Sequence, residues 1–562
     1  MDYIKTTIGG QLRHNADQYS DEPAVVYCES QTRWSWAQLD NMVEEVALGL
    51  IAIGAKKGTH IAIWGTNVPE WLLTQFAAAR IGAILVTINP EWKGSELQYA
   101  LDQSDSNILV MIEGFQKQSK SKTYHYDYLA IVNDLCPELE TSNSQKPLQI
   151  KSLPQLRHIV VVNEKQMPGK ISWLEMLKLG TTFPIDSLSK KEKEIVAQDT
   201  AMIQYTSGTT GFPKGTMLTH FNILNNAKAA ASFMQLTAHD RLCGPVPYYH
   251  CFGSILVNLC CLVTGATMVI PAQHFNAHMT LESIQNEKCT ALHGVPTMFI
   301  EQLEDQDFTL FDLSSLRTGI IAGAPVEMEL MEAIAHKMGA RNMTIGYGLT
   351  EASPITHQTH PEDPWEKRAM TVGKPTPETD SKIVDVNSLE ELAVGQVGEI
   401  WVKGYHVMKG YYNKPEETEK AIVDGWLRTG DLGKVDEEGY YHIVGRLKEL
   451  ILVGGHNVYP AEVEQALHTL LADKIEMLQV VGVPHPKLQE VVAMVVKCQP
   501  GVQLTLEEVR LACEGKMEWP KIPRHLSMVK DFSPFMTVTG KIQKFKITEF
   551  LIKELQLSTI TS

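Results

Sequence analysis

The sequence predicts an α/β protein with a large N-terminal part and a small α+β C-terminal part. Three observations support this fold class. Short apolar segments alternate with helical patterns over the first hundred residues, and short β-like segments dominate after about residue 376. Beyond a basic, glycine-rich junction at 445–464, a compact mixture of strand and helix follows. Alternation of strands and helices is typical of parallel sheets covered by helices.

The first hundred residues show this alternation element by element. Ser35 is placed to cap a helix that Gly54 ends. The apolar face of that helix consists of Leu39, Val43, Val46 and Leu50. A further helix is expected at 70–81, and strands are expected at 24–27, 60–64 and 84–88. Residues 115–125 are polar and are interpreted as a surface excursion.

Residues 242–281 contain no Asp, Glu, Lys or Arg. A membrane span needs about 20 mainly apolar residues. This segment is interrupted by Pro245, Pro247, Gly253, Asn258, Gly265 and Pro271. We therefore expect a buried helix that ends near Gly265, followed by a buried strand at 266–270.

The C-terminal third is richer in strands. A capping box of Thr505 and Glu508 indicates the start of a helix. The expected strands cover 381–384, 398–402, 439–444, 478–483 and 491–496. We place the main boundary at Lys448, which divides the chain into a large domain, 1–447, and a small domain, 448–562.

Composition excludes several classes of protein. A net charge of −16 over 562 residues argues against a general nucleic-acid binder. The nine cysteines are odd in number and form no CxxC motif, which argues against a disulfide framework or a zinc site. The N-terminal residues lack the apolar core of a signal peptide. A cytoplasmic enzyme without a transmembrane segment is expected.

The strongest local motif covers 206–215 and follows a strand-like run. Its hydroxyl residues and glycines are suited to surround a polyphosphate with backbone and side-chain donors, and Lys214 adds a mobile positive charge. The spacing differs from that of a Walker A loop, and taken alone a plain surface turn is the alternative. The candidate nucleotide-binding residues here are Thr206, Ser207, Gly208, Thr209, Thr210, Gly211 and Lys214.

Further segments, in their order along the chain, resemble the adenylate-forming superfamily. This superfamily includes acyl-CoA synthetases, firefly-type luciferases and nonribosomal adenylation domains. The resemblance covers essentially the whole chain, and the sequences of the motifs are most similar to those of medium-chain acyl-CoA synthetases. The matching segments are YTSGTTGFPKG (205–215), PYYHCFG (247–253), GVPTMF (294–299), GAP (323–325), GYGLTE (346–351), VKGYHVMKGYYN (402–413), WLRTGD (426–431), GRLKEL (445–450) and VTGKIQKFK (538–546).

The resemblance implies roles for the nucleotide-binding residues. Glu351 matches the magnesium-binding glutamate, with Thr350 beside it. Asp431 matches the acid that accepts both ribose hydroxyls, and Arg446 matches a ribose-contacting arginine. Tyr347 matches the aromatic residue that packs on adenine, with the backbone of Gly323, Ala324 and Pro325 on the opposite face. Gly346 and Gly348 are further nucleotide-binding candidates. The alternatives are a solvated glutamate, a core tyrosine, a turn aspartate and a surface arginine.

The resemblance also implies a mobile small domain. Lys541 matches the lysine that bridges the carboxylate and the α-phosphate of ATP, and Lys448 matches the hinge. After rotation, Gly454, Gly455 and His456 would line a pantetheine tunnel. His250 matches the residue that guards the acyl channel, although a satisfied core histidine is the alternative.

These observations predict a ligase that converts a medium-chain fatty acid to its acyl-adenylate and then to its CoA thioester. ATP, Mg²⁺ and CoA are the implied cofactor and co-substrates. An aryl acid–CoA ligase, an acyl-AMP ligase that loads a carrier protein, and a non-catalytic acyl or nucleotide sensor remain alternatives. The sequence does not fix the oligomeric state.

Overall fold

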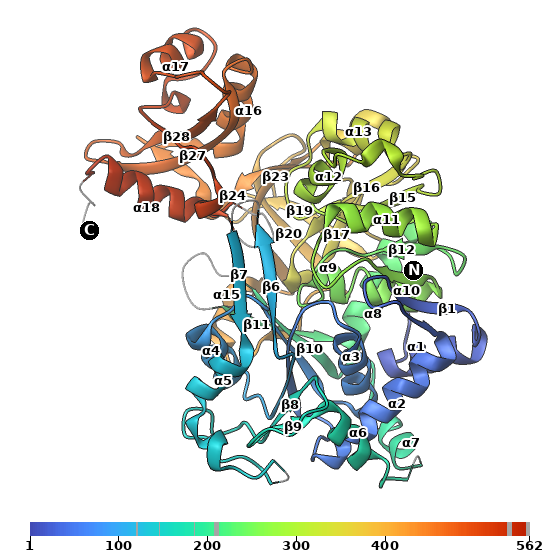
Figure 1. Ribbon diagram of the computed structural model, residues 1–562. Helices are drawn as coiled ribbons and strands as arrows, with labels where there is room; N and C mark the ends of the chain where they lie inside the picture. Colours follow the sequence, from blue (N-terminus) through green and yellow to red (C-terminus); the bar gives the residue numbers. More distant parts are fainter. Residues whose placement is uncertain (120–121, 145, 185, 207–212, 537–541, 558–562) are drawn as a thin grey trace. The chain divides into compact units, whose positions relative to one another are not determined.

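The computed structural model describes the chain except residues 120–121, 145, 185, 207–212, 537–541 and 558–562. The chain forms two compact units, which Figure 1 shows coloured along the sequence. Unit 1 comprises Met1–Asp380 and Val402–Leu427, and unit 2 comprises Ser381–Trp401 and Arg428–Ser562. The predicted boundary between 1–447 and 448–562 stays a prediction.

An eight-stranded sheet in unit 1 carries both ends of segment 206–215, the predicted polyphosphate-binding motif, which is called the phosphate-loop motif below. Its strand order is β21-β11-β10-β4-β3-β5-β8-β9. The strands from β10 to β9 pair in parallel, whereas β11 and β21 add antiparallel strands at one edge. The bounds are β3 His60–Trp64, β4 Ile84–Ile88, β5 Ile108–Met111, β8 His158–Val161, β9 Ile171–Ser172, β10 Thr200–Thr206, β11 Lys214–Thr219 and β21 Gly410–Tyr411.

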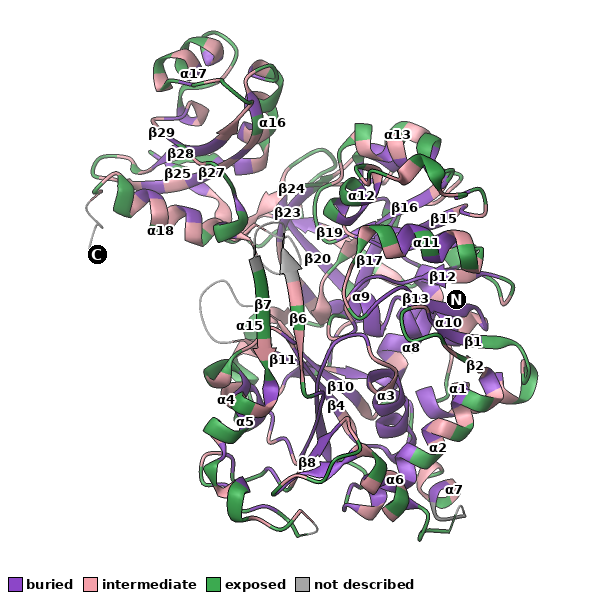
Figure 2. Cartoon of the chain, in the orientation of Figure 1, coloured by how far each residue is buried: buried purple, intermediate pink, exposed green. Residues whose placement is uncertain are grey.

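A nine-stranded sheet in unit 1 has the order β18-β17-β16-β15-β14-β12-β13-β1-β2. The strands from β16 to β1 pair in parallel, and both edges are antiparallel. The bounds are β1 Pro23–Tyr27, β2 Thr32–Ser35, β12 Arg241–Cys243, β13 Thr267–Ile270, β14 Ala291–Leu292, β15 Thr318–Ala322, β16 Asn342–Gly348, β17 Ile355–Gln358 and β18 Lys374–Pro375. Buried residues follow the strands of both sheets (Figure 2).

Helices cover these sheets, and α2, α3 and α6 lie side by side in unit 1 (Figure 1). Ser35 and Gln38 form the capping box of α2, and Leu39, Val43, Val46 and Leu50 are buried. The larger helices are α1 Ile8–Gln18, α2 Trp36–Ala52, α3 Pro69–Ile81, α4 Gly94–Gln103, α5 Tyr128–Leu135, α6 Trp173–Gly180, α8 His220–Phe233, α11 Ala277–Glu287, α12 Pro296–Leu303 and α13 Met328–Lys337. Shorter ones are α7 Asp186–Glu192, α9 Cys251–Ser254, α10 Asn258–Thr264, α14 Trp365–Met370 and α15 Pro415–Ala421.

The uncharged segment 242–281 folds as expected. Helix α10 ends at Gly265, whose φ of 79° is the left-handed conformation that glycine adopts readily, and strand β13 follows. All residues of β13 are buried. Among the described helices, none has the length and apolar character that a membrane crossing needs.

Residues 114–119 and 122–127 form two strands that the sequence pattern did not predict. They make a two-stranded hairpin of β6 Gly114–Ser119 and β7 Lys122–Asp127. The rings of Phe115 and Tyr126 stack at 4.5 Å on this hairpin, and the Tyr126 hydroxyl donates to Glu91. The polar composition concealed this strand pairing, because strands are recognised in a sequence by alternating apolar and polar residues.

Unit 2 contains the predicted strands of the C-terminal third. One sheet has the order β26-β25-β28-β27 with β29 beside β28, and the capping box of Thr505 and Glu508 begins α17 as predicted. The bounds are β25 Ile451–Val453, β26 His456–Val458, β27 Ile475–His485, β28 Gln489–Cys498, β29 His525–Met528, α16 Pro460–Leu470, α17 Leu506–Cys513 and α18 Lys544–Glu554. A further sheet, whose residues are divided between unit 1 and unit 2, includes β19 Thr379–Val384, β20 Gly398–Gly404, β22 Ile422–Val423, β23 Trp426–Val435 and β24 Tyr441–Arg446.

Candidate active site

The phosphate-loop motif connects two antiparallel strands. Thr206 ends β10, Lys214 begins β11, and the two residues face each other across the ladder. Ser207, Gly208, Thr209, Thr210 and Gly211 lie outside the described residues. The Lys214 ammonium sits 4.2 Å from the centre of the Tyr411 ring and 3.9 Å from a carboxylate oxygen of Glu417. Lys214 is therefore directed by an aromatic ring and an acid in unit 1.

The predicted adenine segments leave two adjacent parallel strands at the same end. Ala322 of β15 pairs with Gly346 of β16, so the loop 323–325 begins beside 346–348. The carboxyl ends of parallel strands are the usual place for ligands in open α/β sheets. Gly348 has no room for a side chain, because a Cβ atom there would lie 1.8 Å from the Pro354 carbonyl oxygen.

Tyr347 lies on β16 with its ring half-buried. The ring centre is 5.7 Å from that of His357, at an interplanar angle of 49°. Burial lowers the pKa of His357 to about 3, so this imidazole is neutral. The Tyr347 ring thus has a buried neutral neighbour, which is compatible with a stacking role.

Glu351 lies in a 3₁₀ turn, Thr350–Ala352, that follows β16. Its carboxylate oxygen Oε1 accepts a hydrogen bond of 2.7 Å from the Tyr411 hydroxyl, and its carbonyl accepts one of 2.9 Å from the Met408 amide. Within the described part of the chain, no hydrogen bond or ion pair engages Oε2. Mg²⁺ is usually bound by one or two carboxylates plus substrate phosphates and water. A half-buried carboxylate with one oxygen occupied fits such a cation.

His250 is exposed, so the alternative of a satisfied core histidine does not apply. It caps α9, and its Nδ1 accepts a hydrogen bond of 3.1 Å from the Phe252 amide. The next residue, Cys251, has its sulfur 3.7 Å from the Thr350 hydroxyl. This contact brings the start of the uncharged segment next to the turn that bears Glu351. Burial raises the pKa of Cys251 to about 12, so the thiol is protonated and is no nucleophile.

In unit 2, Asp431 and Arg446 are brought together. They are paired residues of the antiparallel strands β23 and β24, and Arg446 Nε lies 3.2 Å from Asp431 Oδ1. Asp431 is largely buried and Arg446 is about half-exposed. A carboxylate held by an arginine at a strand position is suited to accept hydroxyl groups of a ligand.

Glu399 is a further residue of this region that sequence reasoning missed. Its buried carboxylate accepts hydrogen bonds from Trp401 Nε1 at 2.8 Å, from Arg428 Nε and Nη2 at 3.1 and 3.0 Å, and from the Gly430 amide at 3.1 Å. Gly430 directly precedes Asp431 and has a φ of 71°. Glu399 therefore holds the turn that carries Asp431. No motif marks it, because the interaction depends on the pairing of β20 with β23.

Gly454 and Gly455 form the two-residue loop between β25 and β26, with φ values of 57° and 85°. Positive φ at both positions is the requirement of a type I′ turn. His456 begins β26 and contacts Trp519 edge to face at 5.5 Å. Lys448 lies in the 3₁₀ turn Leu447–Glu449, and Lys541 lies outside the described residues. Their predicted roles, including the hinge, remain predictions.

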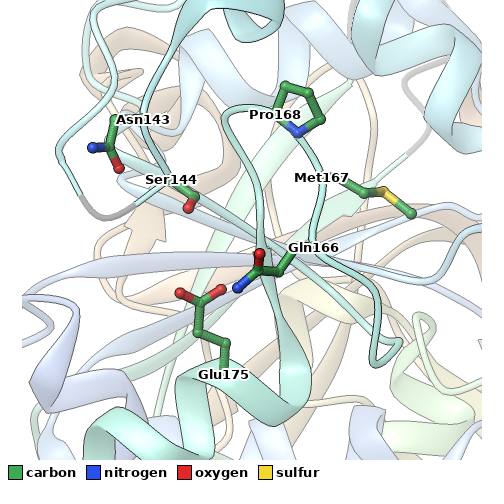
Figure 3. Close-up of a pocket in the computed structure, with 6 residues that line it drawn as sticks. All are labelled: Asn143, Ser144, Gln166, Met167, Pro168 and Glu175. Atoms are coloured by element: carbon green, nitrogen blue, oxygen red, sulfur yellow. The ribbon is translucent and has the colours of Figure 1, made fainter.

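Two other features of unit 1 lie apart from these residues. Figure 3 shows a surface hollow, lined by Asn143, Ser144, Gln166, Met167, Pro168 and Glu175, that contains none of the predicted site residues. Across the described chain, one group of three candidate metal ligands with mutually close atoms occurs, at His278, Asp305 and Asp307. This group lies at the surface and does not contain Glu351. A cation at Glu351 would therefore take its other ligands from substrate and water.

Comparison with known proteins gives consistent results. The family model described as AMP-binding enzyme matches residues 12–412. The chain is 44% identical to YngI of Bacillus subtilis (strain 168), over 99% of both chains. It is 39% identical to the medium-chain acyl-CoA ligase ACSF2, mitochondrial, of Danio rerio, over 98% of this chain and 89% of that protein.

The crystal structure of ATP-bound MatB from Rhodopseudomonas palustris has a TM-score of 0.81 and 25% identity to this chain, covering 98% of this chain and 99% of MatB. These relatives confirm the predicted α/β fold class and the predicted kinship with adenylate-forming acyl-CoA synthetases. A family model that spans most of the chain, together with relatives that are similar over nearly its whole length, decides the assignment. The chain belongs to the AMP-binding enzyme family.

Proposed function

We propose that this enzyme is an AMP-forming acid–thiol ligase whose substrate is a medium-chain fatty acid and whose acceptor is CoA. In the first step a carboxylate oxygen of the acid attacks the α-phosphorus of ATP, and the bond to pyrophosphate breaks. In the second step the CoA thiol loses its proton and attacks the acyl carbon, and AMP leaves. The medium-chain ligase ACSF2 among the relatives supports this choice of acid.

One observation carries the proposal. The contact of 3.7 Å between Cys251 and Thr350 places the uncharged segment 242–281 beside the turn with Glu351. An apolar acid bound along this segment would have its carboxyl end near the residues proposed for ATP. No Lys or Arg lies in the segment to pair with a second carboxylate, which favours a monocarboxylic acid with an alkyl chain.

The residues of this chain have distinct proposed tasks. Lys214 and the loop 206–211 bind the phosphates, because backbone donors and a flexible ammonium suit a polyphosphate. Asp431 and Arg446 bind the ribose, and Tyr347 stacks on adenine between its two glycines. Glu351 would hold Mg²⁺, which screens the two anions as they approach each other when it is bound. Lys541 would contribute a second positive charge during adenylation only.

The test is a pyrophosphate-release screen over acids from acetate to palmitate, plus aryl acids, with and without CoA. Burial of each CH₂ group contributes about 0.8 kcal/mol, so kcat/KM is expected to rise about fourfold per CH₂ until the pocket is full. A maximum at medium chain length with thioester as product supports the proposal. A maximum with aryl acids, or release of free acyl-adenylate despite CoA, would replace it by one of the alternatives.

A second experiment separates the two steps. Lys541→Ala is expected to abolish pyrophosphate release, whereas conversion of supplied acyl-adenylate and CoA to thioester continues. A non-catalytic sensor would show neither reaction in the unmodified protein. Equal loss of both half-reactions in the variant would contradict the proposed division of tasks.

A further inference from the structure

Tyr411 joins two residues of the proposed ATP site that the sequence places far apart. Its hydroxyl donates a hydrogen bond of 2.7 Å to Glu351 Oε1, and its ring centre lies 4.2 Å from the Lys214 ammonium. An ammonium at this distance over a ring face is attracted by the ring quadrupole. One side chain thus contacts both the phosphate-loop lysine and the acid proposed for magnesium.

The position of Tyr411 is fixed by its backbone. It lies in β21 and pairs with Thr216 of β11. Lys214 is on the same strand β11, two residues before Thr216. Its amide donates a hydrogen bond of 2.9 Å to the Thr418 hydroxyl, and only 5% of the residue is exposed. A side chain held on a strand and buried at this level keeps one rotamer.

The Tyr411 phenol is a permanent donor toward Glu351. A tyrosine hydroxyl has an ordinary pKa of about 10, so at neutral pH it carries its proton and can donate it to Glu351 in the hydrogen bond of 2.7 Å. A hydrogen bond from this hydroxyl therefore always occupies the same carboxylate oxygen. The shape of the carboxylate then leaves Oε2 as the oxygen available to a ligand.

Tyr411 also separates two opposite charges. In the described structure no ion pair joins Lys214 to Glu351, although both contact the same tyrosine. Without the ring, an ammonium and a carboxylate in such proximity would attract each other and partly neutralise the site. With it, the negative charge of Glu351 is kept from Lys214 and remains for a cation, while the Lys214 ammonium lies 3.9 Å from Glu417.

We propose that Tyr411 is a positioning residue that orients Glu351 for Mg²⁺ and keeps Lys214 from pairing with it. This inference rests on the proposed role of Glu351 in binding the magnesium of Mg²⁺·ATP. It goes beyond that role because it assigns a task to the segment 402–413, which contacts both charges and has no proposed contact with substrate.

The experiment measures metal binding directly, with Mn²⁺ as the probe. Binding of Mn²⁺ in the presence of a non-hydrolysable ATP analogue is followed by water proton relaxation. Tyr411→Phe removes one oxygen atom and retains the ring. We expect it to weaken Mn²⁺ binding about tenfold, which is the effect of losing one hydrogen bond to a charged group. The Mg²⁺ concentration for half-maximal pyrophosphate release is expected to rise by a similar factor.

The neighbouring Tyr412 offers a matched control. Its hydroxyl donates to Asp105 at 3.0 Å, so Tyr412→Phe makes the same chemical change one residue away. We expect unchanged Mn²⁺ binding in this variant. Thermal unfolding of both variants shows whether each remains folded, and Tyr411→Leu, which also removes the ring, is expected to weaken Mn²⁺ binding more than Tyr411→Phe.

Glu351→Gln distinguishes the two proposals. If Glu351→Gln weakens Mn²⁺ binding and Tyr411→Phe does not, the positioning role is overturned and the metal role of Glu351 stands. If Glu351→Gln leaves Mn²⁺ binding unchanged, the metal role falls and the positioning role falls with it. Equal Mn²⁺ affinity in Tyr411→Phe and Tyr411→Leu would remove the separating function of the ring.

Discussion

Replacement of Glu399 tests the view that this residue holds the turn with Asp431. The two carboxylate oxygens receive four hydrogen bonds, three at Oε2 and one at Oε1, and all come from N–H donors. In Glu399→Gln the amide NH₂ must face at least one of these donors in either orientation. A buried donor left without an acceptor costs about 1–3 kcal/mol, which is the expected loss of unfolding free energy. Glu399→Ala removes both acceptors and is expected to cost about 3–5 kcal/mol.

Replacement of Glu399 should also affect ATP binding, because Gly430 is directly bonded to Asp431. Loss of the Gly430 amide bond loosens the turn, so Asp431 is expected to lose its alignment and the KM for ATP to rise about tenfold, equivalent to about 1.4 kcal/mol. The KM for the acid should stay unchanged. Urea unfolding followed by tryptophan fluorescence gives the stability, and Trp401, which donates to Glu399, is itself a reporter. The exposed Glu437 supplies the control Glu437→Gln. A Glu399→Gln variant with unchanged stability and unchanged KM for ATP would refute the reasoning.

Three further predictions concern other parts of the chain. Asp431→Ala is expected to weaken binding of a non-hydrolysable ATP analogue in calorimetric titration, while unchanged affinity would remove Asp431 from the site. Burial lowers the pKa of His406 to about 4 from about 6.5 in an unfolded chain. Between pH 4 and pH 6.5 the unfolded state therefore binds a proton at His406 that the folded state does not bind. The free energy of unfolding falls by about 3 kcal/mol as the pH drops from 6.5 to 4. His406→Leu should flatten this dependence in thermal unfolding, and an unchanged slope would contradict it. Lys448→Pro fixes φ at about −65°. This variant is expected to release one burst of pyrophosphate as usual but to form thioester more slowly in the steady state. Unimpaired turnover by the folded variant would exclude a hinge at Lys448.

Local signals in the sequence predicted the ends of several helices. Ser35 begins α2 with its capping box, Gly265 ends α10 at positive φ, and Thr505 caps α17. Each signal acts within one turn of the chain, so it can be recognised without knowledge of the tertiary structure. The parallel sheets followed from alternation of strands and helices, which the observed pairings confirm.

Residues whose roles depend on strand pairing were not predictable in this way. Glu399 acts on Gly430 across the ladder of β20 and β23, and Tyr411 reaches Glu351 because β21 pairs with β11. Sequence separations of 31 and 60 residues lie between these partners. The paired strands 114–119 and 122–127 were missed for a different reason, because their mostly polar residues give only a weak strand pattern.

The donors around Glu351 and Glu399 distinguish an acid proposed to bind a cation from an acid that holds the fold together. In Glu399 both oxygens accept hydrogen bonds, so a ligand would have to displace existing donors at a cost of about 1–3 kcal/mol each. Among the described residues, the Glu351 carboxylate receives a hydrogen bond at one oxygen only, from a neutral phenol rather than from an arginine. A neutral donor orients a carboxylate without cancelling its charge, whereas an arginine cancels it. The charge of Glu351 is therefore preserved for a cation, while that of Glu399 is used within the fold to hold the turn of Asp431.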